Sequence, residues 1–295
     1  MNFASSGAGS PDSIAWPDAA RRGVFDAWLG GIAGREQLDP ASLRAASSDA
    51  SFRRYFRVDR VADAADGAAS RIVMDAPPPQ EDVRPFVRIA GLVEAAGLPA
   101  PRVLAQDAGN GFLLLTDLGS TLLLDELNGL LAGGDVDAAA RRMRAVGSTL
   151  VGWQCGVDAA ELPPFDEALL RRELALFPAW CVLREHGVRW SDAQRAVWEG
   201  ACDLLVQSAL AQPTIAVHRD FMPRNLMPTR DGIGLLDFQD AVRGPIAYDV
   251  ASMLRDAFIS WDEEVEIDLA VRYWEAARRV RVPVDADFGE FWRQI

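Results

Sequence analysis

The chain has 295 residues, 49% of them hydrophobic, which is enough material for two packed cores. A formal net charge of −13 argues against a nucleic-acid partner, because binding to a phosphate backbone needs a basic surface. No apolar run reaches the length of a membrane helix, and the opening MNFASSGAGSPDS lacks the basic start and apolar core of a secretion signal. We therefore expect a cytoplasmic protein with no membrane contact.

Residues 1–116 read as a small lobe that begins with a disordered, polar stretch up to about Pro17. Apolar residues at helical spacing then predict a helix over 19–32. Strands are predicted at 43–47, 52–58, 71–75, 102–106 and 112–116, with a helix at 82–96. Residues 117–295 are mostly helical, with helices expected at 135–155, 165–186, 191–211, 246–259 and 263–280. The fold class is α+β, with an antiparallel-sheet lobe followed by a helical lobe.

Three cysteines, Cys155, Cys181 and Cys202, lie apart within the helical patterns. Their spacing fits neither a disulfide framework nor a zinc site. We expect three reduced, buried thiols.

One stretch between the helices, residues 217–249, gathers residues suited to chemistry. Asp220 follows His218 by two positions, Asn225 comes five positions later, and Asp237 ends an apolar run twelve positions beyond that. Residues 226–228 and 233–236 can pair as a hairpin around a three-residue loop. In that register Asn225 lies opposite Asp237, with side chains roughly 5 Å apart. A loop of two or four residues would shift the pairing by one.

A carboxylate and an amide oxygen brought together in this way are ligands of the kind that Mg²⁺ accepts, with water and phosphate completing its shell. Asp220 could then accept a proton from an attacking hydroxyl, which is the division of roles in kinase-type phosphoryl transfer. Each residue alone also suits an ordinary loop or turn. The joint pattern favours the functional interpretation.

The segments HRDFMPRN and LLDFQDAVRGPIAYDVA resemble the catalytic signature of the aminoglycoside phosphotransferase and choline kinase superfamily, which has the protein-kinase fold. With SDASFRRYFRV, IVMDAPP and GFLLLTDLG, the likeness narrows to bacterial anomeric kinases for N-acetylmuramate and N-acetylglucosamine in cell-wall recycling. It runs from about Ala45 to near the C-terminus. Members of that family continue beyond the residue that corresponds to Ile295, so part of the substrate wall would be missing if the chain is truncated.

This resemblance implies a bilobal, protein-kinase-like fold that uses ATP and Mg²⁺. The adenine would bond to the backbone of a hinge that spans Thr116, Asp117 and Leu118. Asp249 resembles an aspartate that hydrogen-bonds the catalytic loop, although a helix N-terminal charge is the competing interpretation. His218 is expected to be a buried organiser of the loop rather than a base.

The segment expected to cover the phosphates departs from the kinase pattern. Residues 47–51 contain no glycine, although the hydroxyls of Ser48 and Ser51 could donate to phosphate. Met74 occupies the strand position of the usual lysine, and all 30 basic residues of the chain are arginine. Strand alternation places Arg54 beside Phe56, where an arginine is costly unless it is paired.

Arg54 is therefore the predicted replacement for the lysine, with Glu94 as a possible partner. The alternative is that Arg53, Arg54 and Arg57 are merely solvated strand arginines.

Arg224 and Arg243 stand near the catalytic motif in sequence, and Asp240 could line a sugar site or simply solvate a loop. A bidentate arginine suits the lactyl carboxylate of N-acetylmuramate, whereas two arginines would repel a polycationic aminoglycoside. Both arginines could equally be ordinary solvated loop residues.

The sequence thus predicts an ATP-dependent amino-sugar kinase that acts on the anomeric hydroxyl. A kinase for another small alcohol and a nucleotide-binding regulatory module without turnover remain the alternatives. The sequence leaves the oligomeric state open.

Overall fold

A computed structural model describes residue 14 and residues 16–48, 52–61 and 68–295. The described residues form two compact units. The first unit holds those of 1–91 and 100–120, and the second holds 92–99 and 121–295.

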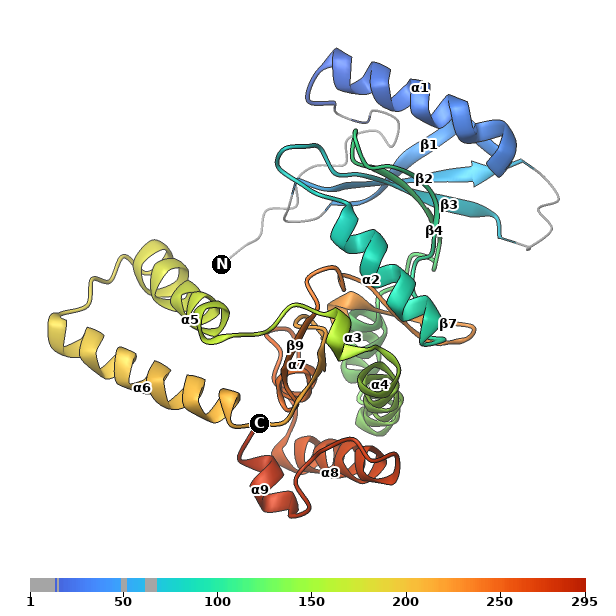
Figure 1. Cartoon of the computed structure of the whole chain (residues 1–295). Coiled ribbons are helices and arrows are strands. Elements are labelled where there is room, and N and C mark those ends of the chain that lie inside the picture. Colours follow the sequence, from blue (N-terminus) through green and yellow to red (C-terminus); the bar gives the residue numbers. More distant parts are fainter. Residues whose placement is uncertain (1–13, 15, 49–51, 62–67) are drawn as a thin grey trace. The chain divides into compact units, whose positions relative to one another are not determined.

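A five-stranded antiparallel sheet is the base of the first unit (Figure 1). Its strand order is β1-β2-β3-β5-β4. The strands are β1 (Leu38–Ser48), β2 (Arg54–Arg60), β3 (Ser70–Asp75), β4 (Val103–Asp107) and β5 (Phe112–Thr116). Because side chains alternate along a strand, Arg54 and Phe56 lie on one face of β2, and Tyr55 and Arg57 lie on the other. All five predicted strands are confirmed.

Helix α1 (Ala19–Glu36) covers one face of this sheet. The side chain of Asp18 caps it by accepting the N–H of Arg21 at 2.6 Å, which satisfies one of the free donors of the first turn. Phe25, Leu29 and Ile32 repeat at helical spacing and pack with sheet residues such as Phe56, Val73 and Leu114 into the core of the unit. The predicted helix over 19–32 is confirmed and runs one turn further.

Helices dominate the second unit. Those that precede the catalytic stretch are α3 (Leu123–Ala132), α4 (Val136–Gly156), η1 (Ala159–Glu161), α5 (Glu167–Leu176), η2 (Phe177–Glu185) and α6 (Asp192–Leu210). Those that follow it are α7 (Tyr248–Leu254), α8 (Glu263–Arg279) and α9 (Phe288–Trp292). Helix α2 (Arg84–Ala95), most of which belongs to the first unit, matches its predicted range. The predicted α+β class is confirmed.

Two helix predictions need correction, and one helix was missed. The helix α3 was not predicted, and the helix expected over 246–259 is limited to α7. The single helix expected over 165–186 is divided into the α-helix α5 and the π-helix η2. Pro178 lies at the start of η2, and because proline has no N–H it cannot make the regular helical bond back to residue 174.

The hairpin at the catalytic stretch pairs β7 (Leu226–Thr229) with β8 (Gly232–Leu235), and two residues separate Thr229 from its partner Gly232. The predicted three-residue loop and its register are therefore wrong by one position. Gly232 does adopt a positive φ of 128°. A second short ladder joins β6 (Thr214–Val217) to β9 (Val242–Pro245).

Among the described residues, no helix has both the length and the apolar character needed to span a membrane. All three cysteines are free, as predicted, but only Cys202 is buried. Cys155 is exposed near the end of α4, because helical spacing alone does not reveal which side of a helix meets solvent.

Candidate active site

The loop after β6 is fixed by one buried carboxylate. Asp249, in the first turn of α7, is fully buried and accepts the backbone N–H of His218 at 2.7 Å and of Arg219 at 3.0 Å. Burial raises the pKa of Asp249 to about 7, against the lowering effect of these two bonds. Arg219 adopts a φ of 79°, a left-handed conformation that is rare for a residue with a side chain. The two bonds from the Asp249 carboxylate hold this strained turn.

Asp220 follows the strained residue directly. Burial is the main reason that the pKa of its carboxyl group rises to about 6, and the nearby charge of Asp237 adds to the shift. A carboxylate with this pKa is ionised at neutral pH and is still basic enough to take a proton from an alcohol.

Asn225 ends the short turn η3 (Pro223–Asn225) and is tied to the same loop. Its Nδ2 donates to the backbone oxygen of Asp220 at 3.0 Å, and its own backbone oxygen accepts the N–H of Leu236 at 2.9 Å. Because the amide nitrogen is committed to the loop, the Oδ1 atom is the part of the side chain that is left to bind a cation.

Asp237 lies one residue beyond the position that pairs with Asn225. The register puts Leu236 opposite Asn225, and Asp237 then leaves the ladder with a φ of 59°. Its Oδ1 accepts a hydrogen bond from Nε2 of Gln239 at 2.7 Å. Gln239, which no sequence pattern indicated, is buried, and its Nε2 also donates to Asp240 Oδ2 at 3.4 Å.

The donor set fits a hard divalent cation in part. Asn225 supplies an amide oxygen and Asp237 a carboxylate, and side-chain hydrogen bonds anchor both residues to the same segment of the chain. No cluster of three or more His, Cys, Asp or Glu side chains suited to a metal occurs among the described residues. A cation here would therefore take most of its ligands from water or phosphate.

His218 is fully buried between aromatic rings. Its ring lies 5.1 Å from that of Trp153 and 5.7 Å from that of Phe221, measured between centroids. Burial lowers the pKa of His218 to about 4, so the ring is neutral at physiological pH.

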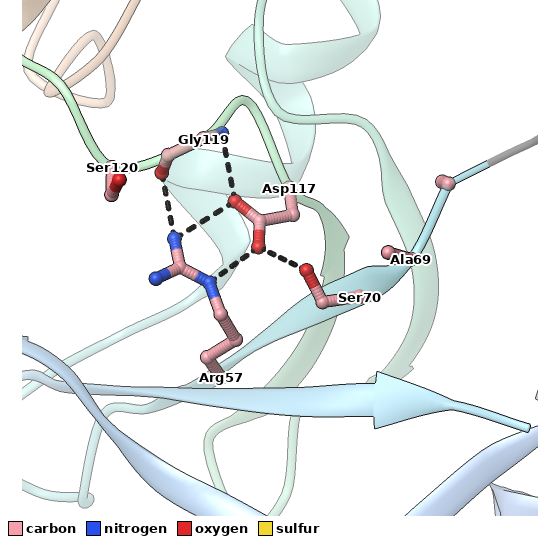
Figure 2. Close-up of a pocket in the computed structure, with 7 residues that line it drawn as sticks. Arg57, Ala69, Ser70, Asp117, Gly119 and Ser120 are labelled. Atoms are coloured by element: carbon pink, nitrogen blue, oxygen red, sulfur yellow. Dashed lines mark hydrogen bonds and ion pairs between the residues drawn. The ribbon is translucent and has the colours of Figure 1, made fainter.

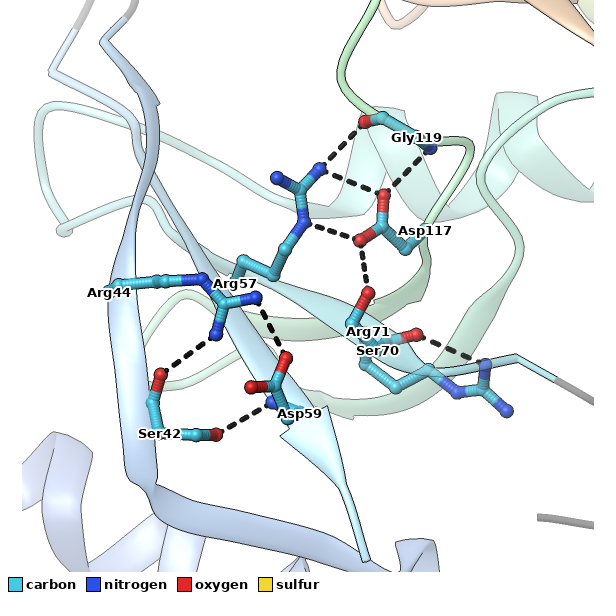
Figure 3. A network of polar contacts seen from close by, with 8 residues as sticks. All are labelled: Ser42, Arg44, Arg57, Asp59, Ser70, Arg71, Asp117 and Gly119. Carbon is cyan, nitrogen blue, oxygen red and sulfur yellow. Dashed lines mark hydrogen bonds and ion pairs between the residues drawn. The ribbon is translucent and has the colours of Figure 1, made fainter. Parts of the chain in front are cut away.

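In the first unit, the predicted hinge carries a dense polar network (Figures 2 and 3). The Asp117 carboxylate accepts Arg57 Nε at 2.6 Å, Ser70 Oγ at 2.7 Å and the N–H of Gly119 at 2.8 Å. Arg57 Nη2 also donates to the backbone oxygen of Gly119 at 2.7 Å. Although burial alone would raise it, these donors hold the pKa of Asp117 below its ordinary value.

These residues surround a hollow of about 250 Å³ that Ala69 and Ser120 also line. Thr116 and Leu118, the hinge residues on either side of Asp117, differ in their hydrogen bonds. Thr116 is paired with Arg102 through both its N–H and its hydroxyl, at 3.0 and 2.9 Å. Leu118 makes no backbone hydrogen bond within the described part of the chain, so its N–H and C=O are open to a ligand.

Arg53, which directly precedes β2, and Arg54 and Arg57 of β2 are not simply solvated, contrary to the alternative considered from the sequence. Arg53 pairs with Glu81 at 2.9 Å, Arg57 pairs with Asp117, and Arg54 forms an ion pair with Asp75. Asp75 is fully buried and also pairs with Arg21 of α1.

Arg54 also lies over two aromatic rings, 4.5 Å from the centroid of Trp16 and 5.4 Å from that of Phe56. Asp75 was not predicted as its partner. The role predicted for Arg54 at the phosphates stays a prediction, as does that of Ser48, whereas Ser51 lies outside the described residues.

The three residues predicted to bind the sugar, Arg224, Asp240 and Arg243, each make different contacts. Arg224 is exposed and lies 5.1 Å from the ring centroid of Phe258. Arg243 is exposed on β9, where its backbone bonds Pro163 and Phe165. The backbone oxygen of Asp240 accepts Arg219 Nη1 at 3.4 Å.

The fold is the protein-kinase-like fold of small-molecule kinases. An ethanolamine kinase from Plasmodium vivax superposes with a TM-score of 0.62 at 12% identity, over 95% of this chain and 80% of that one. An ADP-bound aminoglycoside phosphotransferase gives a TM-score of 0.55 at 16% identity, over 90% and 85%. At these identities the likeness concerns the fold alone.

The chain belongs to the phosphotransferase enzyme family, whose family model matches residues 42–285. It is 48% identical to the N-acetylmuramate/N-acetylglucosamine kinase of Pseudomonas aeruginosa over 257 residues, which are 87% of this chain and 72% of the relative. It is 42% identical to the enzyme of the same name from Neisseria meningitidis serogroup B, over 90% of this chain and 76% of the relative.

Proposed function

We propose that this protein transfers the γ-phosphoryl group of ATP to the anomeric hydroxyl of N-acetylmuramate or N-acetylglucosamine. The observation that carries the proposal is Asp220, a carboxylate with a raised pKa that follows a turn held by Asp249. The relatives at 42–48% identity, which are named for these two sugars, support the choice of substrate.

In the proposed reaction, Asp220 accepts a hydrogen bond from the anomeric hydroxyl and takes its proton as the oxygen attacks. The bond between the γ-phosphorus and the bridging oxygen breaks, ADP leaves, and the sugar 1-phosphate forms. An anomeric hydroxyl is more acidic than an ordinary alcohol, so a carboxylate base is sufficient.

The remaining roles belong to the same proposal. Asn225 and Asp237 hold Mg²⁺, which when bound neutralises charge on the phosphates. His218 and Asp249 support the loop. The hinge residues Thr116, Asp117 and Leu118 face the adenine, with Ser48, Ser51 and Arg54 on the phosphates and Arg224, Asp240 and Arg243 on the sugar. Residues 1–116 and 117–295 act as the two lobes.

A cytoplasmic setting in cell-wall recycling completes the proposal. The three free cysteines support it, because thiols stay reduced in that compartment.

ADP release, measured with a panel of sugars, tests the proposal. We expect turnover with N-acetylmuramate or N-acetylglucosamine and a loss of about 10³-fold in kcat for Asp220→Ala. The matched control is Asp231→Ala in the exposed hairpin turn, which should leave kcat unchanged. Phosphorus NMR identifies the product, since a phosphate on the anomeric carbon couples to the anomeric proton.

Two results would overturn the proposal. Activity with choline or aminoglycosides alone would show that the substrate class is wrong. Nucleotide binding without transfer to any acceptor would instead favour a regulatory module.

A further inference from the structure

The side chain of Arg219 links the catalytic loop to helix α5, which is distant in sequence but in direct contact with it. Arg219 Nη2 donates to Glu173 Oε1 of α5 at 2.9 Å, and its guanidinium carbon lies 5.9 Å from the ring centroid of Phe165. The exposed fractions of the two charged side chains are 16% and 28%, so the ion pair is largely withdrawn from solvent. The loop is therefore held through its backbone by Asp249 and through its side chain by Glu173.

A second ion pair on the same helix shows how different this arrangement is. Glu167 and Arg171 of α5 interact at 2.7 Å, but their side chains are 56% and 43% exposed. Pairs in that setting contribute little, because water and ions screen them. Glu173 instead pairs with the residue that has the left-handed backbone and that directly precedes Asp220.

We propose that Glu173 is a positioning residue of the phosphotransferase, which acts through Arg219 to hold Asp220 in line with the acceptor hydroxyl. The proposal rests on the function assigned to Asp220 above. It adds that α5, 46 residues away from the loop along the chain, takes part in setting the geometry of the reaction.

The charge of Glu173 also acts on Asp220. Beyond burial, Asp237, Asp240 and Glu173 raise the pKa of Asp220, whereas Arg219 lowers it. Tyr248 and Asp249 also interact electrostatically with Asp220, and the exposed Arg172 lies 4.0 Å from Glu173. Replacing Glu173 with glutamine removes a negative charge and frees the guanidinium of Arg219, and both changes lower the pKa of Asp220.

The experiment compares Glu173→Gln with the wild type and with Glu167→Gln, the matched control on the exposed side of α5. For Glu173→Gln we expect kcat to fall about 10- to 100-fold, because small errors in the placement of a reacting group are costly. The KM values for sugar and ATP should stay unchanged, and the acid limb of the kcat profile should move to lower pH. The double variant with Arg219→Gln should lose little more than the single variant, because the two residues act as one unit.

Two kinetic results would overturn the proposal. A rise in the KM for sugar at constant kcat would make Glu173 a substrate contact. A loss of activity that follows a lower melting temperature, with the pH profile unmoved, would make its role only structural.

A second measurement needs no turnover and so separates this inference from the proposed function. The backbone amide signals of Arg219 and Asp220 are compared by NMR in the wild type, in Glu173→Gln and in Glu167→Gln. A shift of both signals in Glu173→Gln but not in Glu167→Gln supports the inference even if no sugar is phosphorylated. Unchanged signals in Glu173→Gln contradict it, even if the wild type proves to be an active sugar kinase.

Discussion

The buried carboxylate of Asp249 accepts the backbone N–H of Arg219 at 3.0 Å, where the chain takes a left-handed turn with a φ of 79°. Replacing Asp249 with alanine leaves this N–H and that of His218 unpaired inside the protein. We expect a loss of about 3 kcal/mol in the free energy of unfolding, measured with urea, together with a large fall in kcat.

The control for this prediction is Asp262→Ala. Asp262 precedes α8 but makes no capping bond and is exposed, so its loss should change stability little. Equal effects of the two variants would contradict the special role of Asp249.

Stability should depend on pH through buried groups that act in opposite directions, with Asp220, whose pKa burial raises to about 6, acting in the same direction as Asp249. Asp249 has a pKa of about 7 in the folded protein and an ordinary value of 3.8, so the folded state holds more protons between these values and stability falls as pH rises through them. His218 has a pKa of about 4 against an ordinary 6.5, so stability rises with pH over that range.

Asp249→Asn removes the titration of Asp249 and leaves that of His218. Between about pH 4 and 6.5 the slope of stability against pH should therefore be more positive in the variant than in the wild type. Urea midpoints measured across this range test the prediction, and parallel curves for the two proteins would refute it.

Catalysis should fail on the acid side near the pKa of Asp220. Because burial and Asp237 raise this pKa to about 6, the ionised form that accepts a proton is lost as pH falls through that value. The measurement is kcat against pH at saturating sugar and ATP. An acid limb at the ordinary value of an aspartate would count against Asp220 as the base.

The Arg57–Asp117 pair should stabilise the first unit. Arg57→Gln removes two donors from a carboxylate that is only 7% exposed, and we expect a loss of about 2 kcal/mol in the free energy of unfolding and weaker ATP binding. Arg44→Gln is the matched control, since the Arg44–Asp59 pair is more than 40% exposed on both sides and should contribute less than about 1 kcal/mol. Similar losses in both variants would show that burial of the pair is irrelevant.

Asn225→Ala should increase the Mg²⁺ concentration that the enzyme requires. The change removes the amide oxygen offered to the cation, so the Mg²⁺ concentration needed for half-maximal rate should rise about tenfold or more. The melting temperature without metal should change far less. Asn128→Ala on the exposed face of α3 is the control, and an unchanged Mg²⁺ requirement in Asn225→Ala would exclude this residue as a ligand.

Much of the fold follows from local patterns. Apolar residues at helical spacing identified α1, α2, α4, α6 and α8, and short segments between turn residues identified the five strands of the first sheet. The order of His218, Asp220, Asn225 and Asp237 pointed to the catalytic stretch. These features depend on neighbours in the chain, so the sequence itself determined them.

Only the tertiary structure decided the contacts between distant segments. The hairpin register depended on whether the turn has two or three residues, a difference that composition does not resolve. Arg54 pairs with Asp75 on the neighbouring strand, 21 positions away in sequence. Arg219 pairs with Glu173 on α5, 46 positions away. Packing of the chain brings both pairs of charges together. Spacing along a chain does not predict such pairs, because the two charged residues meet only when the segments that carry them pack together.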